Sequence, residues 1–180
     1  MIVSYRKGCV WMGEPRFQID HEFVVSQEKT YFGNQSDIYQ VEDRFTILLG
    51  GQKFFEEPHF PLLEFALHFK KWDREGRKGD FNFCSLDYDD YIPIIRLLRK
   101  GNLWHFRSIW EEFDSSHLLF FVDEIFPVLE AFVKRVDQEL YDVCGYEIDY
   151  YYEIEFRKYF PMKRSFKKWL FEKLSFSDSK

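Results

Sequence analysis

Residues 44–75 change their hydrophobic period partway along, and this change limits the possible folds more than any other feature of the chain. The stretch "RFTILLGGQKFF" (44–55) carries β-branched and aromatic residues on both sides of Gly50 and Gly51. Because a two-residue primed turn needs positive φ angles, which glycine adopts readily, we expect a β-hairpin here. The apolar residues that follow recur at helical spacing, which predicts a helix over about 60–75. Strands and helices must therefore share one core.

The middle of the chain predicts a three-stranded antiparallel meander. Its strands are expected at 80–86, 92–99 and 103–110, joined by "DYDDY" (87–91) and by "KGN" (100–102). Short segments rich in β-branched and aromatic residues between such turns are typical of strands.

Alternation along these segments assigns their side chains to faces. In 103–110 we expect Trp110 to share a face with Trp104 and Phe106, because residues two apart point the same way in a strand. Cys84 falls inside the first strand, where we interpret it as a small buried residue rather than an activated thiol.

A long amphipathic helix is predicted over about 117–143. Ser115 or Ser116 can cap its start and Gly145 can end it, while Pro127 predicts a kink or a helix in two pieces. Its apolar stripe recurs at three- and four-residue intervals and consists of Leu118, Phe121, Val122, Ile125, Leu129, Phe132, Val133, Val136, Leu140 and Val143.

These elements predict an α+β protein, a largely antiparallel sheet with about three helices packed on it. A chain of 180 residues is expected to form a single domain spanning 1–180. Aromatic residues make up 21% of the chain, and 22 of them are Phe. Disordered segments avoid such residues, so we expect most of the chain to be packed.

The cysteines and the apolar segments indicate the cellular compartment of the protein. Cys9, Cys84 and Cys144 are scattered and form no CxxC pair, which favours reduced thiols over a disulfide framework or a zinc site. The start of the chain lacks the apolar region of a signal peptide, and no later run reaches the ~18 apolar residues of a membrane span. We expect a cytoplasmic protein with no membrane span and no cofactor.

Carboxylates are expected to gather at one end of the meander. If the first strand rises into the turn at 87–91, the third strand rises again and "WEEFD" (110–114) emerges at the same end. We call these residues the acidic rim and predict that they bind a basic protein partner: Asp87, Tyr88, Asp89, Asp90, Tyr91, Glu111, Glu112 and Asp114.

Catalytic and metal-binding chemistry lacks support in the sequence. The segment "DYDDYIPIIRLL" has neither the glycine at the sixth position nor the glutamate at the twelfth that a calcium-binding EF-hand loop requires. The five histidines form no HExxH or other ligand spacing, and GxSxG, GxxxxGK[ST] and GxGxxG are absent. We therefore expect no catalytic residue, no metal ligand and no enzyme, although a hydrolase with an unrecognised carboxylate site stays open.

The C-terminal segment 146–180 is rich in tyrosine at first and basic afterwards. Residues 156–180 carry eight Lys and Arg against two acidic residues, whereas the chain as a whole has a net charge of −6. Aromatic residues interleaved with cations suit nucleic-acid binding, and this alternative site consists of Arg157, Lys158, Lys163, Arg164, Lys167 and Lys168. Helical spacing of the apolar residues over 166–174 instead favours docking of this segment on the acidic body, so we expect nucleic acid not to be the partner.

In size, charge and predicted architecture the chain is similar to small, acidic α+β immunity proteins, which neutralise secreted bacterial toxins. This resemblance implies a non-enzymatic cytosolic protein whose acidic surface covers a basic toxin domain. Three hypotheses follow from the sequence: a protein-binding module such as an immunity protein, a nucleic-acid-binding regulator, and a hydrolase.

Overall fold

The computed structural model describes residues 15–22, 33, 35–85, 88 and 92–156, and it describes 4–6 and 9–11 by their backbone alone. Within these ranges the strands form three antiparallel sheets, in the orders β1-β2, β3-β4-β5 and β6-β7-β8-β9. The strands are β1 (Ser4–Arg6), β2 (Cys9–Trp11), β3 (Phe17–Glu22), β4 (Glu42–Leu49), β5 (Gln52–Pro61), β6 (Phe81–Phe83), β7 (Ile95–Lys100), β8 (Leu103–Ser108) and β9 (Phe120–Phe121). The helices are α1 (Gln35–Gln40), α2 (Leu62–Arg74), α3 (Val122–Cys144) and α4 (Ile148–Phe156).

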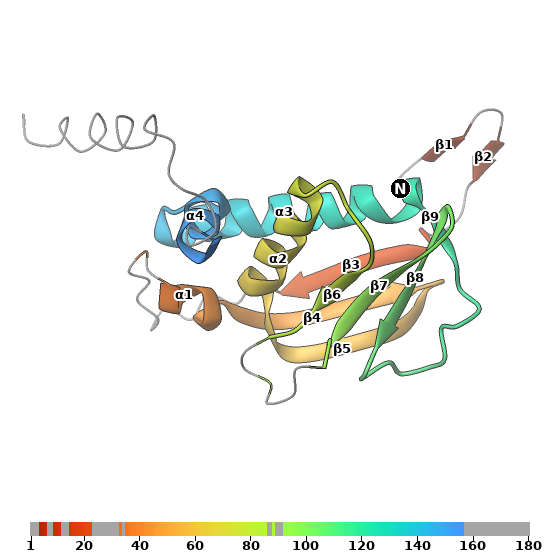
Figure 1. The fold of residues 1–180 in the computed structure, drawn as a ribbon, viewed down its shortest axis with the longest axis horizontal. Helices are drawn as coiled ribbons and strands as arrows, with labels where there is room; N and C mark the ends of the chain where they lie inside the picture. The colour runs from red at the N-terminus through yellow and green to blue at the C-terminus, as the bar shows by residue number, and fades with distance from the viewer. Residues whose placement is uncertain are drawn as a thin grey trace, which may run out of the picture.

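The predicted α+β class is confirmed, and Figure 1 shows α2, α3 and α4 on one side of the strands. The strands do not form the one sheet that we expected. They divide mainly into a three-stranded and a four-stranded sheet, and Phe17 of β3 stacks on Phe106 of β8 with ring centroids 4.7 Å apart. None of the helices in the described ranges is long and apolar enough to cross a membrane.

The predicted hairpin and the helix after it are both confirmed. Gly50 and Gly51 have φ angles of +61° and +79° between β4 and β5, as a primed turn requires. α2 begins at Leu62, two residues later than expected, because Phe60 and Pro61 still pair with β4. Pairing with a neighbouring strand therefore decides where this helix begins.

A cluster of phenylalanine rings joins α2 to the strands and to α3. The ring of Phe65 on α2 lies 5.4 Å from Phe45 and 5.4 Å from Phe60 in the three-stranded sheet, measured between centroids. It also lies 5.1 Å from Phe83 on β6 and 5.7 Å from Phe132 on α3. Edge-to-face and tilted contacts of this kind stabilise aromatic cores beyond the area that they bury. Many of the phenylalanines that the structure describes thus share one core.

The predicted meander is confirmed as β6, β7 and β8, although its first strand is shorter than expected. β6 ends at Phe83, so Cys84 lies just beyond the strand and is half-buried. Burial, together with the nearby Glu64 carboxylate, raises the pKa of the Cys84 thiol. The next residue, Ser85, donates a hydrogen bond of 2.5 Å from its hydroxyl to buried Glu64 on α2. This bond joins the end of β6 to α2.

The long helix α3 starts at Val122 rather than at 117. Phe120 and Phe121 form β9 and pair with β8, so Leu118 and Phe121 do not belong to the helical stripe. Neither predicted serine caps the helix. The N–H of Phe121 donates to the Glu124 carboxylate at 2.7 Å, while Ser115 donates its hydroxyl to the Phe106 carbonyl.

α3 runs through Pro127 as one continuous helix, not as two pieces. Pro127 lies close to the start of the helix and is exposed. The predicted end is confirmed: Gly145 has a φ of +74° and donates its N–H to the Tyr141 carbonyl.

Candidate functional site at the end of the meander

The structure describes half of the predicted acidic rim. Tyr88, Glu111, Glu112 and Asp114 lie in described ranges, whereas Asp87, Asp89, Asp90 and Tyr91 lie outside them. The ring of Tyr88 contacts the ring of Trp110 edge to face, with centroids 4.9 Å apart. The segment between β6 and β7 therefore meets the segment that follows β8 at one end of the sheet.

Glu111 is a structural anchor rather than a free carboxylate. Its two oxygens accept from the Arg107 guanidinium, at 3.0 Å from Nε and 2.8 Å from Nη2. One of them also accepts from the N–H of Ser108 at 3.3 Å, and the side chain is only 15% exposed. The paired contacts between Arg107 and Glu111 hold the turn at the end of β8.

Glu112 and Asp114 also have partners within the protein. The Glu112 carboxylate lies 3.2 Å from the Lys53 ammonium, and its backbone N–H donates to the Phe54 carbonyl at 2.8 Å. Asp114 accepts from both the N–H and the hydroxyl of Ser116, each at 2.9 Å. These hydrogen bonds lower the pKa of Asp114, so this exposed carboxylate is ionised at neutral pH.

Exposed apolar side chains lie at the same end of the sheet. Ile92 precedes β7 and Ile109 follows β8, and since Ile95 pairs with Ser108, both emerge beyond this pair. They are 50% and 48% exposed, and neighbouring Trp110 is 37% exposed. We call Tyr88, Ile92, Ile109 and Trp110 the meander-end surface.

Packing against Phe55 and Tyr88 fixes the orientation of Trp110. Its ring stacks on Phe55 of β5, with centroids 6.1 Å apart, and Tyr88 closes on it from the loop after β6. Trp110 thus lies beyond the end of β8 rather than on its buried face, contrary to the alternation pattern of the sequence. An aromatic ring held in place beside exposed isoleucines is typical of a binding surface.

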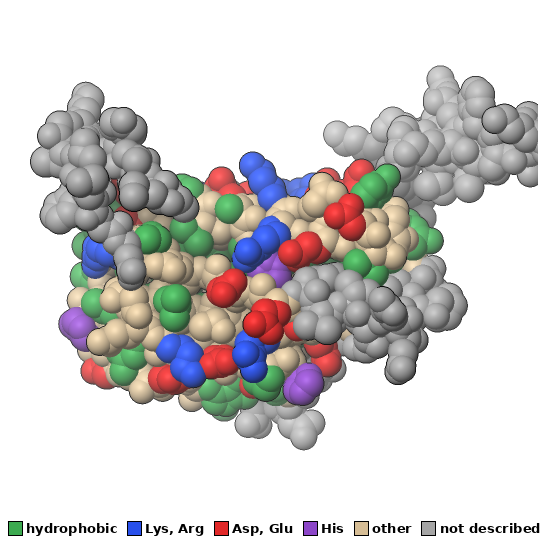
Figure 2. All heavy atoms as spheres, turned by 180° about the vertical axis from the view of Figure 1, so that it is seen from behind, with side chains coloured by type: hydrophobic (Ala, Val, Ile, Leu, Met, Phe, Trp, Pro, Cys, Tyr) green, Lys and Arg blue, Asp and Glu red, His purple; other side chains and the backbone are tan. Residues whose placement is uncertain are grey.

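Charges elsewhere on the body are intermixed. On the face shown in Figure 2, acidic and basic side chains alternate over the described residues. Arg44 lies 3.6 Å from Glu56, and Lys53 lies 2.5 Å from the same carboxylate. Such exposed pairs contribute little to stability, but they cancel the local field.

The histidines in the core do not form a site. His105 is buried, with Nε2 3.1 Å from the Ser115 carbonyl, and burial lowers its pKa. The ring of His68 packs on Phe83 and Phe156, and burial lowers its pKa as well. In the part of the chain that the structure describes, no three His, Cys, Asp or Glu side chains lie close enough to hold a metal ion.

The C-terminal segment is described only as far as Phe156. α4 contacts α2 through Asp149, whose carboxylate lies 2.7 Å from the Lys70 ammonium and 2.6 Å from the Arg74 guanidinium. The alternative nucleic-acid residues Arg157, Lys158, Lys163, Arg164, Lys167 and Lys168 lie outside the described residues.

One polar cluster was not found from the sequence. His21 on β3 contacts both Arg135 and Glu139 on α3. The spacing of Arg135 and Glu139 places them on one side of a helix, but nothing in the sequence pairs that side with a residue more than one hundred positions earlier.

The fold and the meander-end surface define an α+β protein with an exposed apolar surface beside carboxylates. The chain belongs to a family described as a domain of unknown function, DUF7878, which residues 16–142 match. The matched range includes the whole meander-end surface and ends inside α3. No curated protein and no solved structure matches the chain.

Proposed function

We propose that this protein is a non-enzymatic binding module that docks a protein partner on the meander-end surface. The exposure of Ile92, Ile109 and Trp110 at one end of the sheet carries this proposal. Burying such side chains contributes roughly 1.5–3 kcal/mol each, so a few of them can dominate the affinity of an interface.

The aromatic residues supply the anchor. Trp110 stands between Phe55 and Tyr88 and does not have to be ordered when a partner arrives. Preorganisation of this kind lowers the entropic cost of binding. Trp and Tyr are also the residue types most enriched among interface residues that carry large binding energies.

The charge around this surface favours a basic partner. Asp114 supplies an ionised carboxylate, and Asp87, Asp89 and Asp90 lie next to Tyr88 in the sequence. Because Glu111 and Glu112 are engaged by Arg107 and Lys53, we assign the attraction mainly to the four aspartates. Complementary charge of this kind speeds encounter and confers specificity more than it adds affinity.

The resemblance to immunity proteins suggests which partner the protein binds. As an immunity protein it binds a basic toxin domain at the meander-end surface and blocks the active site of that toxin. The protein itself needs no catalytic residue for this role.

Capture of partners from a lysate of the native host tests the proposal. Wild-type protein is compared with a variant carrying Ile92→Ser and Ile109→Ser, two changes at exposed positions that leave the core intact. Val122→Ser is the matched control, since Val122 is 49% exposed and lies at the opposite end of β8, beside the Leu103–Phe121 pair. We expect one basic protein to be captured by the wild type and the control but lost with the double variant.

Equal capture by the double variant would refute the meander-end surface as the binding site. Nuclease treatment of the lysate distinguishes a protein-binding module from a nucleic-acid-binding regulator. A regulator of that kind would lose its captured material after digestion. Once the partner is identified, its association rate is expected to fall as salt rises and after charge reversal at Asp114.

A further inference from the structure

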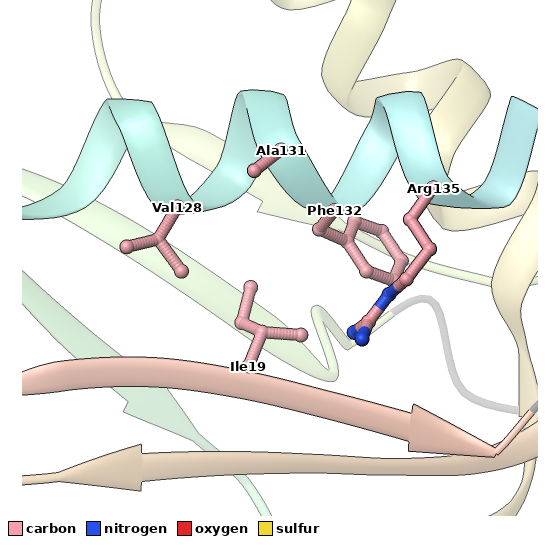
Figure 3. A pocket seen from close by; sticks show the side chains of 5 residues that line it. All are labelled: Ile19, Val128, Ala131, Phe132 and Arg135. Carbon is pink, nitrogen blue, oxygen red and sulfur yellow. The ribbon is translucent and has the colours of Figure 1, made fainter. Parts of the chain in front are cut away.

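A second candidate site lies on the side of the strands that the helices cover, between β3 and α3. A cavity of about 240 Å³ opens there, lined by Ile19, Val128, Ala131, Phe132 and Arg135. Figure 3 shows Ile19 rising from β3 toward α3, while Arg135 extends from the helix toward the strand. Four of the five lining side chains are apolar, and the fifth carries a permanent positive charge.

Arg135 is held by a buried histidine. Its Nη2 lies 2.8 Å from Nδ1 of His21, whose side chain is fully buried. A guanidinium can only donate, so His21 Nδ1 accepts this hydrogen bond and the proton of the neutral ring lies on Nε2. Nε2 then donates to the Glu139 carboxylate, 2.8 Å away.

The chain of contacts from Glu139 through His21 to Arg135 orients the guanidinium. The ring of Phe132 meets His21 edge to face at 5.2 Å and completes the support. Arg135 is exposed, yet its hydrogen bond to His21 holds the guanidinium between helix and strand. His21 is the hydrogen-bond partner found for Arg135 among the described residues, and no other residue of those ranges occupies the remaining N–H donors of its guanidinium.

We propose that this cavity binds a short aliphatic monocarboxylate, with the carboxylate on Arg135 and the alkyl chain against Ile19, Val128 and Ala131. A planar guanidinium matches a carboxylate with two parallel hydrogen bonds. The walls offer an apolar surface to the rest of the ligand, and the cavity is smaller than the roughly 300–1,000 Å³ of drug-sized sites, which selects a small molecule. This inference is independent of the protein-binding function.

Binding of isovalerate and of hexanoate to the full-length protein tests this inference. Titration calorimetry gives the affinities, and ligand-observed NMR detects weak binding. We expect both carboxylates to bind, and we expect hexanol, which has the same chain without the charge, to bind at least about tenfold more weakly.

Three variants make the test specific. Arg135→Met removes the guanidinium and should weaken carboxylate binding by at least about tenfold. Ala131→Leu fills the cavity, leaves the contacts of Arg135 with His21 in place, and should have the same effect. Lys134→Met is the matched control and should bind like the wild type, since Lys134 lies on the same helix but faces a different hollow between α2 and α3.

Several outcomes would overturn the inference. They are the absence of carboxylate binding to the wild type, equal binding of hexanol and hexanoate, and unchanged binding by Ala131→Leu. Because Ala131→Leu leaves the Arg135–His21–Glu139 contacts intact, it decides the matter even if Arg135→Met fails to fold.

Discussion

Asp37 on α1 is fully buried, and its hydrogen bonds join α1 to α4. Its carboxylate accepts from the Tyr151 hydroxyl at 2.9 Å and from the Gly33 N–H at 2.7 Å. Gly33 has a φ of +66°, and a Cβ at this position would lie 2.4 Å from the Tyr146 ring, so only glycine fits there. A buried carboxylate is tolerated only where donors surround it.

Tyr151→Phe is therefore expected to destabilise the protein by about 1–3 kcal/mol, because it removes one of the donors to a buried carboxyl group. Tyr150→Phe is the matched control. The Tyr150 hydroxyl donates to the Gly33 carbonyl at 2.7 Å, but Tyr150 is exposed, so water can replace the lost bond. Urea denaturation of both variants gives the comparison, and equal losses would contradict the role of Asp37.

His68 makes stability depend on pH. Burial lowers the pKa of this imidazole in the folded protein below its ordinary value of about 6.5. As pH falls through about 6.5, the unfolded chain therefore takes up a proton before the folded chain does, and stability falls. His105 acts in the same direction.

His68→Leu is expected to reduce this loss of stability between about pH 7.5 and about pH 5.5. The free energy of unfolding is measured for wild type and variant at both values. The comparison at the higher pH, where the histidine is neutral in both states, isolates the change in packing. A variant with the same pH dependence as the wild type would show that His68 does not contribute.

At the scale of elements, α4 packs on α2 through both apolar and charged contacts. Tyr152 is buried, and the guanidinium of Arg74 lies 4.2 Å from its ring centroid. Asp149 forms exposed ion pairs with Lys70 and with Arg74. The two kinds of contact differ in what they contribute to stability.

Tyr152→Ala is expected to cost about 3 kcal/mol, since it removes a buried ring from the α2–α4 contact. Asp149→Ala is expected to cost less than about 1 kcal/mol, since its ion pairs are exposed to solvent. Thermal and urea denaturation of the two variants measure both values. A larger loss for Asp149→Ala would mean that charge, rather than burial, holds α4 in place.

The sequence predicted elements well where their signals are local. The β4–β5 hairpin depends on Gly50 and Gly51, and α2 depends on apolar spacing within its own turns. Prediction from the sequence failed where contacts between distant residues determine the end of a strand or helix. Phe121 continues the helical pattern of α3, yet Phe120 and Phe121 pair with β8, and Ser85 lies beyond the end of β6 and bonds to Glu64.

For the candidate sites too, features with a local signal were predictable and contacts between distant residues were not. Joining Tyr88 to the segment after β8 required only the topology of a meander, and that juxtaposition was predictable. The exposure of Ile109 and Trp110 was not, since alternation says which face a residue takes but not where the strand ends. The contact of Arg135 with His21 joins residues more than one hundred positions apart and has no local signal.

At the scale of the whole molecule, one continuous core supports two separate surfaces. The meander-end surface lies beyond the ends of β7 and β8, while the Arg135 cavity lies between β3 and α3. The first offers exposed apolar side chains beside carboxylates, and the second offers one guanidinium in an apolar hollow. The chemistry of the two surfaces selects different partners. Because the surfaces consist of different residues, a mutation can remove one surface and leave the other.

The most direct test of protein binding at the meander-end surface is photo-crosslinking in the native host. A photoreactive phenylalanine analogue replaces Ile92 or Ile109 in two proteins, and Val122 or Tyr141 in two controls with similar exposure. We predict one shared protein adduct from positions 92 and 109 and none from 122 and 141. Adducts from all four positions alike, or from the control positions alone, would contradict the proposed binding surface.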